Sequence, residues 1–161
     1  MPKLPLFAFS LLVCSSLTMA QSKIDTKWHC SKPTDDQKLE VGDVPDHTYS
    51  LGQGTCDATE STGDLKEKSG HYTEVHDAWK ASLNVHGYYN ETMDDGDKVY
   101  STYEASNSTD PTKPVSNKWK IVRGTGKYKG IKGSGGCTGK LNSDGSDDLT
   151  CTGTYSIGKG M

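Results

Sequence analysis

The sequence contains no long apolar run beyond its first twenty residues, no excess of positive charge and no C-x-x-C pair. A membrane-spanning helix needs about 20 consecutive apolar residues, so none is expected in the body of the chain. The net charge of −3 argues against nucleic acid and anionic membranes as partners. Because Cys and His form no compact cluster, we expect no zinc site, and we predict neither a metal nor another cofactor.

Hydrophobic residues make up only 32% of the chain, a low content that is also found in disordered proteins. Eight Tyr and three Trp, however, occur in short alternating segments that are typical of strands joined by polar turns. The length of 161 residues suits a single domain. The composition therefore favours an all-β fold.

Residues 1–20 have the pattern of a secretory signal peptide. Lys3 precedes an apolar run over residues 4–13, and Thr18 and Ala20 place small side chains where a signal peptidase reads them. We therefore predict export, to a periplasm or out of the cell, after cleavage near Ala20. The alternatives are a retained anchor and lipidation at Cys14, although lipoprotein signals usually place Gly or Ala, not Val, before that Cys.

Four Cys follow the predicted signal peptide, and their even number in an exported chain indicates two disulfides. The count alone leaves three pairings open. With Asp144 at the centre of the turn 142–146, Cys137 would face Cys151 across two adjacent antiparallel strands, unless a bulge shifts the register. We therefore predict the disulfides Cys137–Cys151 and, by elimination, Cys30–Cys56. The same register places Leu149 over Gly139 and Tyr155 over Gly133.

The remainder of the chain is predicted to form an irregular, extended arm over residues 21–46, followed by a single barrel domain over residues 47–161. Strict alternation over 79–90 indicates a half-buried strand, with a helix over 72–80 as the alternative. The other predicted segments are a strand at 47–54, a polar connection at 57–69, a turn at 94–97, a strand at 98–106 and a loop at 107–114.

The stretch 119–140 contains seven glycines in 22 residues. A phosphate-binding loop would place such glycines between a strand and a helix, but no helical pattern follows here and no G-K-[ST] is present. A flexible linker would not carry Trp119, Ile121, Tyr128 and Ile131 at strand-like spacing. Glycines within strands allow bends and close backbone approach, so we predict that this stretch is barrel wall.

From Trp119 to Gly135 the chain reads W-x-I-x-x-G-T-G-x-Y-x-G-I-x-G-S-G. This segment resembles a strand–turn–strand element of the allene oxide cyclase-like and dirigent-like barrel families, above all their uncharacterised exported bacterial members. One departure is Arg123, where those families commonly have Gly. The resemblance implies an antiparallel, up-and-down barrel of about eight strands that often forms homo-oligomers and whose mouth can hold a small apolar ligand. It transfers no catalytic residue to this chain.

Ten residues predicted to face inward would either line a ligand cavity or simply fill the barrel. They are Tyr49, Leu51, Trp79, Leu83, Val85, Tyr89, Tyr103, Trp119, Ile121 and Tyr155. Three carboxylates on predicted strands, Glu74, Glu91 and Glu104, could also point inward, although the barrel rim is the alternative. His71 and His76 should lie on opposite faces of a strand because their separation is odd.

These features predict an exported barrel that binds a small hydrophobic molecule, or has a structural role, without catalysis. The alternative is an isomerase or cyclase acting on an apolar substrate in the barrel mouth. A filled barrel would favour the structural role. An open apolar cavity with a buried carboxyl group of raised pKa would favour the enzyme.

Overall fold

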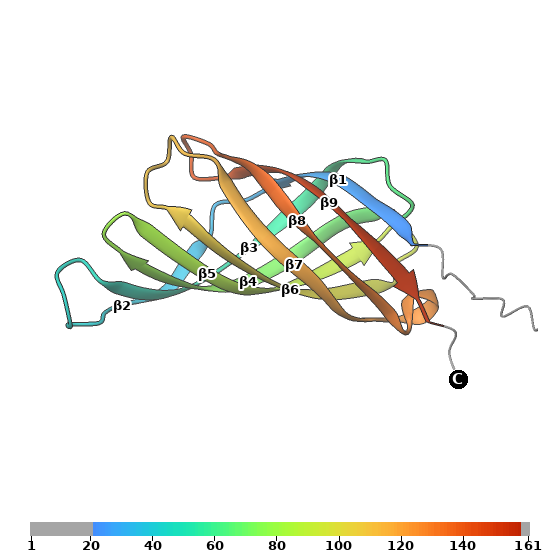
Figure 1. Ribbon diagram of the computed structural model, residues 1–161, viewed down its shortest axis with the longest axis horizontal. Coiled ribbons are helices and arrows are strands. Elements are labelled where there is room, and N and C mark those ends of the chain that lie inside the picture. Colours follow the sequence, from blue (N-terminus) through green and yellow to red (C-terminus); the bar gives the residue numbers. More distant parts are fainter. Residues whose placement is uncertain (1–20, 159–161) are drawn as a thin grey trace, which may run out of the picture.

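The computed structural model describes residues 21–158, so the predicted signal peptide and its cleavage site lie outside the described residues. The described chain forms nine strands and one 3-10 turn (Figure 1). They are β1 (Ser22–Cys30), β2 (Thr34–Glu40), β3 (Thr48–Ser61), β4 (Glu67–Trp79), β5 (Ser82–Met93), β6 (Lys98–Ser108), β7 (Val115–Gly124), η1 (Gly126–Tyr128), β8 (Ile131–Leu141) and β9 (Asp147–Ile157).

Eight of these strands close into an antiparallel barrel. The strand order is β1-β9-β8-β7-β6-β5-β4-β3-β2, and β1 also pairs with β3, which joins the two ends of the sheet. The ninth strand, β2, pairs with the first half of β3 and extends beyond the barrel at the left of Figure 1. The predicted all-β, up-and-down barrel is confirmed.

The irregular arm expected over residues 21–46 is corrected by the structure, because β1 is one of the eight barrel strands. Ile24, Thr26, Trp28 and Cys30 are buried, whereas the residues between them are exposed. This alternation is present in the sequence, but the exposed positions are all charged or His, so the segment looked polar overall. The second strand, β2, is polar except for the exposed Leu39 and forms because it pairs with the edge of β3.

A tight hairpin that was not expected lies within the segment 70–92. Strands β4 and β5 are joined by Lys80 and Ala81 alone, with Lys80 at a φ of 54°. The hairpin places Ala78 opposite Leu83, so inward-facing residues have odd numbers in β5 and even numbers in β4 from Gly70 onward, whereas Glu67 lies beyond a register shift between Glu67 and Ser69. The structure therefore has no helix over 72–80, and β3 and β4 occupy much of the expected connection 57–69.

The C-terminal hairpin has the predicted register. Cys137 pairs with Cys151, Gly139 with Leu149, and Gly133 with Tyr155. Both predicted disulfides are present, Cys137–Cys151 and Cys30–Cys56, each between residues directly opposite each other on neighbouring strands.

A cluster of apolar side chains closes the end of the barrel at which η1 lies, at the right of Figure 1. It consists of Ile24, Leu65, Met93, Val99, Ile121, Tyr128, Ile131 and Tyr155. We call it the plug. A second cluster surrounds the two disulfides in the middle of the barrel and includes Trp28 and Tyr72. Within residues 21–158 no helix has the length and apolar character needed to cross a membrane.

Candidate functional site

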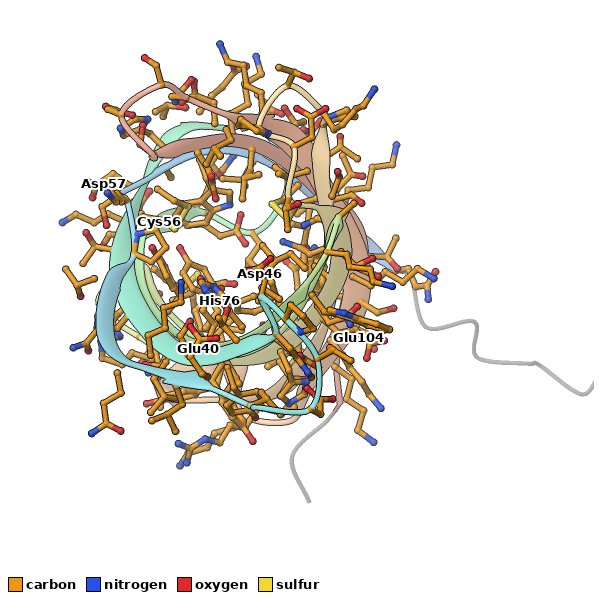
Figure 2. All side chains as sticks on the ribbon, turned by 90° about the vertical axis from the view of Figure 1, so that its left-hand side faces the viewer. Glu40, Asp46, Cys56, Asp57, His76 and Glu104 are labelled. Atoms are coloured by element: carbon orange, nitrogen blue, oxygen red, sulfur yellow. A yellow bond between two sulfur atoms is a disulfide. The ribbon has the colours of Figure 1, made fainter. Side chains whose placement is uncertain are left out.

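A cavity of about 270 Å³ occupies the barrel between the plug and the loops at the opposite end. Its wall is formed by inward-facing residues of the barrel strands and both disulfides. At the loop end, which we call the mouth, it is bordered by Pro33, Asp110, Pro111 and Gly145. Figure 2 looks into this end, with His76 inside the ring of strands and Asp57 and Glu104 outside it. The predicted barrel is thus hollow.

Aromatic rings lie flat along the cavity wall because each covers a glycine of a neighbouring strand. Tyr72 lies over Gly54, Tyr89 over Gly70, Tyr103 over Gly87, and Trp119 over both Gly135 and Gly153. A side chain at any of these glycines would overlap the ring. The glycines therefore let large rings line the wall without filling the interior.

Two carboxyl groups form the floor of the cavity. Glu67 and Glu91 are 7% and 8% exposed, are hydrogen-bonded to each other, and both line the cavity. Thr26 donates a hydrogen bond to Oε2 of Glu67. Burial, then the charge of Glu67, raises the pKa of Glu91 well above its ordinary value. Burial also raises the pKa of Glu67, so the pair favours holding a proton between its two carboxyl groups.

A third carboxyl group, Glu74, lies on the cavity wall and has two partners. Tyr103 donates a hydrogen bond of 2.5 Å to its Oε2, and Nε2 of His76 lies 2.8 Å from its Oε1. Burial and the neighbouring Glu74 carboxylate raise the pKa of the Tyr103 hydroxyl well above its usual range. Tyr103 therefore remains a proton donor, and Glu74 is fixed in orientation between it and His76.

The fourth inner carboxyl group, Asp147, lies near the mouth at the start of β9. Burial, with the nearby carboxylates of Glu74 and Asp148, raises its pKa to about 6. The charge of His29, on the outside of β1, lowers the pKa of Asp147 and so partly offsets this rise.

Four buried polar atoms in residues 21–158 have no hydrogen-bond partner, and all four belong to residues that line the cavity. They are the hydroxyls of Tyr89 and Ser101, the indole Nε1 of Trp119 and the Oδ1 of Asn117. Ser101 is only 3% exposed. Because buried polar groups in proteins nearly always have a partner, these four atoms leave unused hydrogen-bonding capacity at the cavity wall.

The ten residues expected to face inward divide into three groups. Leu83, Val85, Tyr89, Tyr103, Trp119 and Ile121 line the cavity. Tyr155 is part of the plug. Tyr49, Leu51 and Trp79 are between 41% and 45% exposed on the outside of the barrel. Trp79 was placed on the wrong face because the hairpin at Lys80 and Ala81 changes the inward-facing positions from even numbers to odd numbers. In β3 the buried positions are even-numbered, as Ser50 shows, so Tyr49 and Leu51 face outward.

Among the expected carboxylates, Glu74 and Glu91 point inward, whereas Glu104 is exposed on the outer face (Figure 2). His71 is exposed and His76 lines the cavity, as their odd separation predicts. Sequence reasoning missed Trp28, Glu67, Tyr72, Ser101, Asn117 and Asp147. The alternation of Gly70, Tyr72, Glu74 and His76 could have located one of them, Tyr72. Across the part of the chain that is described, no group of three or more His, Cys, Asp or Glu is arranged to hold a metal ion.

Comparison with known proteins supports the fold. No protein-family profile and no curated protein sequence matches the chain. Among solved structures, a protein of unknown function from the DUF3224 family of Shewanella oneidensis MR-1 superposes with a TM-score of 0.55 at 16% identity, over 88% of this chain and 100% of that chain. The pterocarpan synthase dirigent protein GePTS1 superposes with a TM-score of 0.51 at 12% identity, over 95% of this chain and 98% of that chain. The chain therefore shares its antiparallel barrel fold with these two proteins, and a barrel is what the segment 119–135 implied.

Proposed function

We propose that this protein binds one small, largely apolar molecule carrying hydrogen-bonding groups in the cavity of its barrel, without converting it. The observation that carries the proposal is the set of four buried, unpartnered polar atoms at a cavity of about 270 Å³. Apolar walls with a few convergent polar groups are the usual composition of a small-molecule site. A barrel with a purely structural role would gain stability by filling this space and pairing these groups.

Native mass spectrometry of the protein purified from its own compartment tests this proposal, because a bound molecule adds to the mass. A matched variant, Ala105→Trp, places a large ring in the cavity from a residue that lines it. We expect added mass on the wild-type protein that the folded variant lacks. An identical mass on both proteins would contradict binding in the cavity. The same spectrum counts the subunits of any homo-oligomer.

A second candidate function is proton-transfer catalysis, such as the isomerisation of an apolar substrate. It is favoured by Glu74, which is held between a proton donor, Tyr103, and His76 at the wall of an apolar cavity. The raised pKa of the buried Glu91 also favours it. If this function holds, the co-purified molecule incubated in D₂O will gain deuterium with the wild-type protein and not with Glu74→Gln.

We also propose that the chain acts after export. The leader-like residues 1–20 and the two disulfides support this, since disulfides persist in oxidising compartments. The intact mass of the protein isolated from its source tests it. A mature chain beginning at Gln21 with no free thiol is expected, and a chain that retains residues 1–20 would contradict it.

A further inference from the structure

The charged groups that line the cavity are almost all of one sign. Glu67, Glu74, Glu91, Asp110 and Asp147 lie around it, and His76 is the one basic side chain among the described lining residues, with no Lys or Arg. The carboxyl groups extend from the floor to the mouth, so a molecule at any depth is close to at least one of them. The interior therefore repels anions and attracts cations.

The uncharged part of the cavity wall also favours cations. Five aromatic residues line the cavity, namely Trp28, Tyr72, Tyr89, Tyr103 and Trp119. The glycines beneath four of these rings let them lie along the wall, and Trp28 packs edge-on against Tyr89 with ring centroids 5.6 Å apart. Aromatic faces are electron-rich and bind ammonium groups, most strongly where water is excluded.

From these two features and the unpartnered hydroxyl of Ser101, we propose that the ligand of this cavity is an organic cation, a small aromatic or aliphatic amine. The ammonium group would lie among the ring faces with an inner carboxylate as counter-ion, and the apolar part would contact Leu83, Val85 and Ile121. The hydroxyl of Ser101 and the Oδ1 of Asn117 are acceptors available to ammonium protons. This inference rests on the proposed binding function and specifies its ligand class.

Binding of a cation would also release a proton from the floor of the cavity, because burial favours the neutral form of the Glu67–Glu91 pair. The groups that face Glu91 are Glu67 and Tyr89, those that face Glu74 are His76, Tyr103 and Asp147, and those that face Asp147 are Glu74, Asp148 and His29. A cation beside Glu67 and Glu91 favours the ionised form of that pair. An alcohol of the same shape has no such effect.

Three probes of similar size and different charge test this inference by isothermal titration calorimetry. They are 2-phenylethylamine, 2-phenylethanol and phenylacetate, titrated at pH 7.5 in two buffers of different ionisation enthalpy. We expect the amine to bind about tenfold more tightly than the alcohol, and phenylacetate not to bind measurably. Proton release should accompany the amine alone.

Three variants test whether the preference for the amine over the alcohol depends on the inner carboxyl groups. In Glu74→Gln and Glu91→Gln, which preserve shape, the advantage of the amine should fall to about twofold, whereas Glu104→Gln on the outer face should leave it unchanged. If the alcohol binds as tightly as the amine to the wild-type protein, the cation inference is overturned while the binding function stands. If none of the three binds, both are overturned. The comparison on the wild-type protein needs no variant to fold.

Discussion

Tyr103 of β6 reaches Glu74 of β4 across the intervening strand, and its hydroxyl donates a hydrogen bond of 2.5 Å to Oε2 of that carboxylate. Gly87 of β5 lies between them in the register and has no side chain in the way. A Cβ at residue 87 would lie 2.3 Å from Cζ of Tyr103. The hydrogen bond between Tyr103 and Glu74 therefore depends on the absence of a side chain at Gly87.

The substitution Gly87→Ala should lower the free energy of unfolding by about 2 kcal/mol, because the new methyl group displaces the Tyr103 ring. Urea denaturation measures the change. In a Tyr103→Ala background the same substitution should cost much less, since the ring is gone. Equal costs in both backgrounds would show that the ring does not cover Gly87 as described.

Removal of the Cys137–Cys151 disulfide by substitution of both residues with Ala should cost about 3 kcal/mol, since the bond closes a loop with a sequence separation of 14. The midpoint in guanidinium chloride measures the loss. Reduction of the wild-type protein should give a larger loss of stability, because it also breaks the Cys30–Cys56 disulfide. That disulfide joins β1 to β3, the pair of strands that closes the barrel. A loss below about 1 kcal/mol for the double substitution would contradict a stabilising role.

The stability of the unliganded protein should fall as the pH rises from about 4 to 7. Asp147, with a folded pKa of about 6 against an ordinary 3.8, binds more protons in the folded state than in the unfolded state across this window. Glu67 and Glu91, whose folded pKa values are also raised, act in the same direction. Chemical denaturation across this pH range measures the trend.

In Glu91→Gln the fall should be shallower, because one of these titrating groups is removed. Glu104→Gln, on the outer face, should follow the wild-type curve. A wild-type stability that rises with pH over this range would show that the inner carboxyl groups are ionised and well paired in the folded protein.

Ser101→Ala should stabilise the unliganded protein by about 1 kcal/mol while weakening ligand binding, because it removes a buried hydroxyl that has no partner. Ser61→Ala is the matched control. Its hydroxyl donates to the carbonyl of Leu65 at 3.0 Å, so its loss should destabilise the protein. Destabilisation by Ser101→Ala would mean that its hydroxyl already has a stabilising partner in the absence of ligand.

The sequence was informative where local chemistry determined the structure. The turn centred on Asp144 sets the register of β8 and β9, and that register gives the pairing of Cys137 with Cys151. Alternation gave the inward face of β5, including Leu83 and Val85. The glycine-rich stretch was correctly identified as barrel wall because apolar residues occur in it at strand spacing.

Other features were hidden because the local sequence carries no recognisable signal for them. Lys80 and Ala81 are not typical turn residues, so the hairpin between β4 and β5 left no local signal and Trp79 was placed on the wrong face. The contact between Glu67 and Glu91 arises from the register of β4 on β5. Asp147 lies opposite Cys30 because β9 pairs with β1, a pairing that no short-range pattern predicts.

The central claim is that a small molecule enters the barrel and reaches its buried polar groups. The three Trp indoles test it directly in ¹H–¹⁵N NMR spectra, since Trp28 and Trp119 line the cavity and Trp79 is 42% exposed on the outside. When 2-phenylethylamine or 2-phenylethanol is added, we expect the Nε1–H signal of Trp119, which has no partner in the free protein, to move, while that of Trp79 stays in place. Movement of the Trp79 signal alone, or of none of the three, would contradict binding inside the barrel.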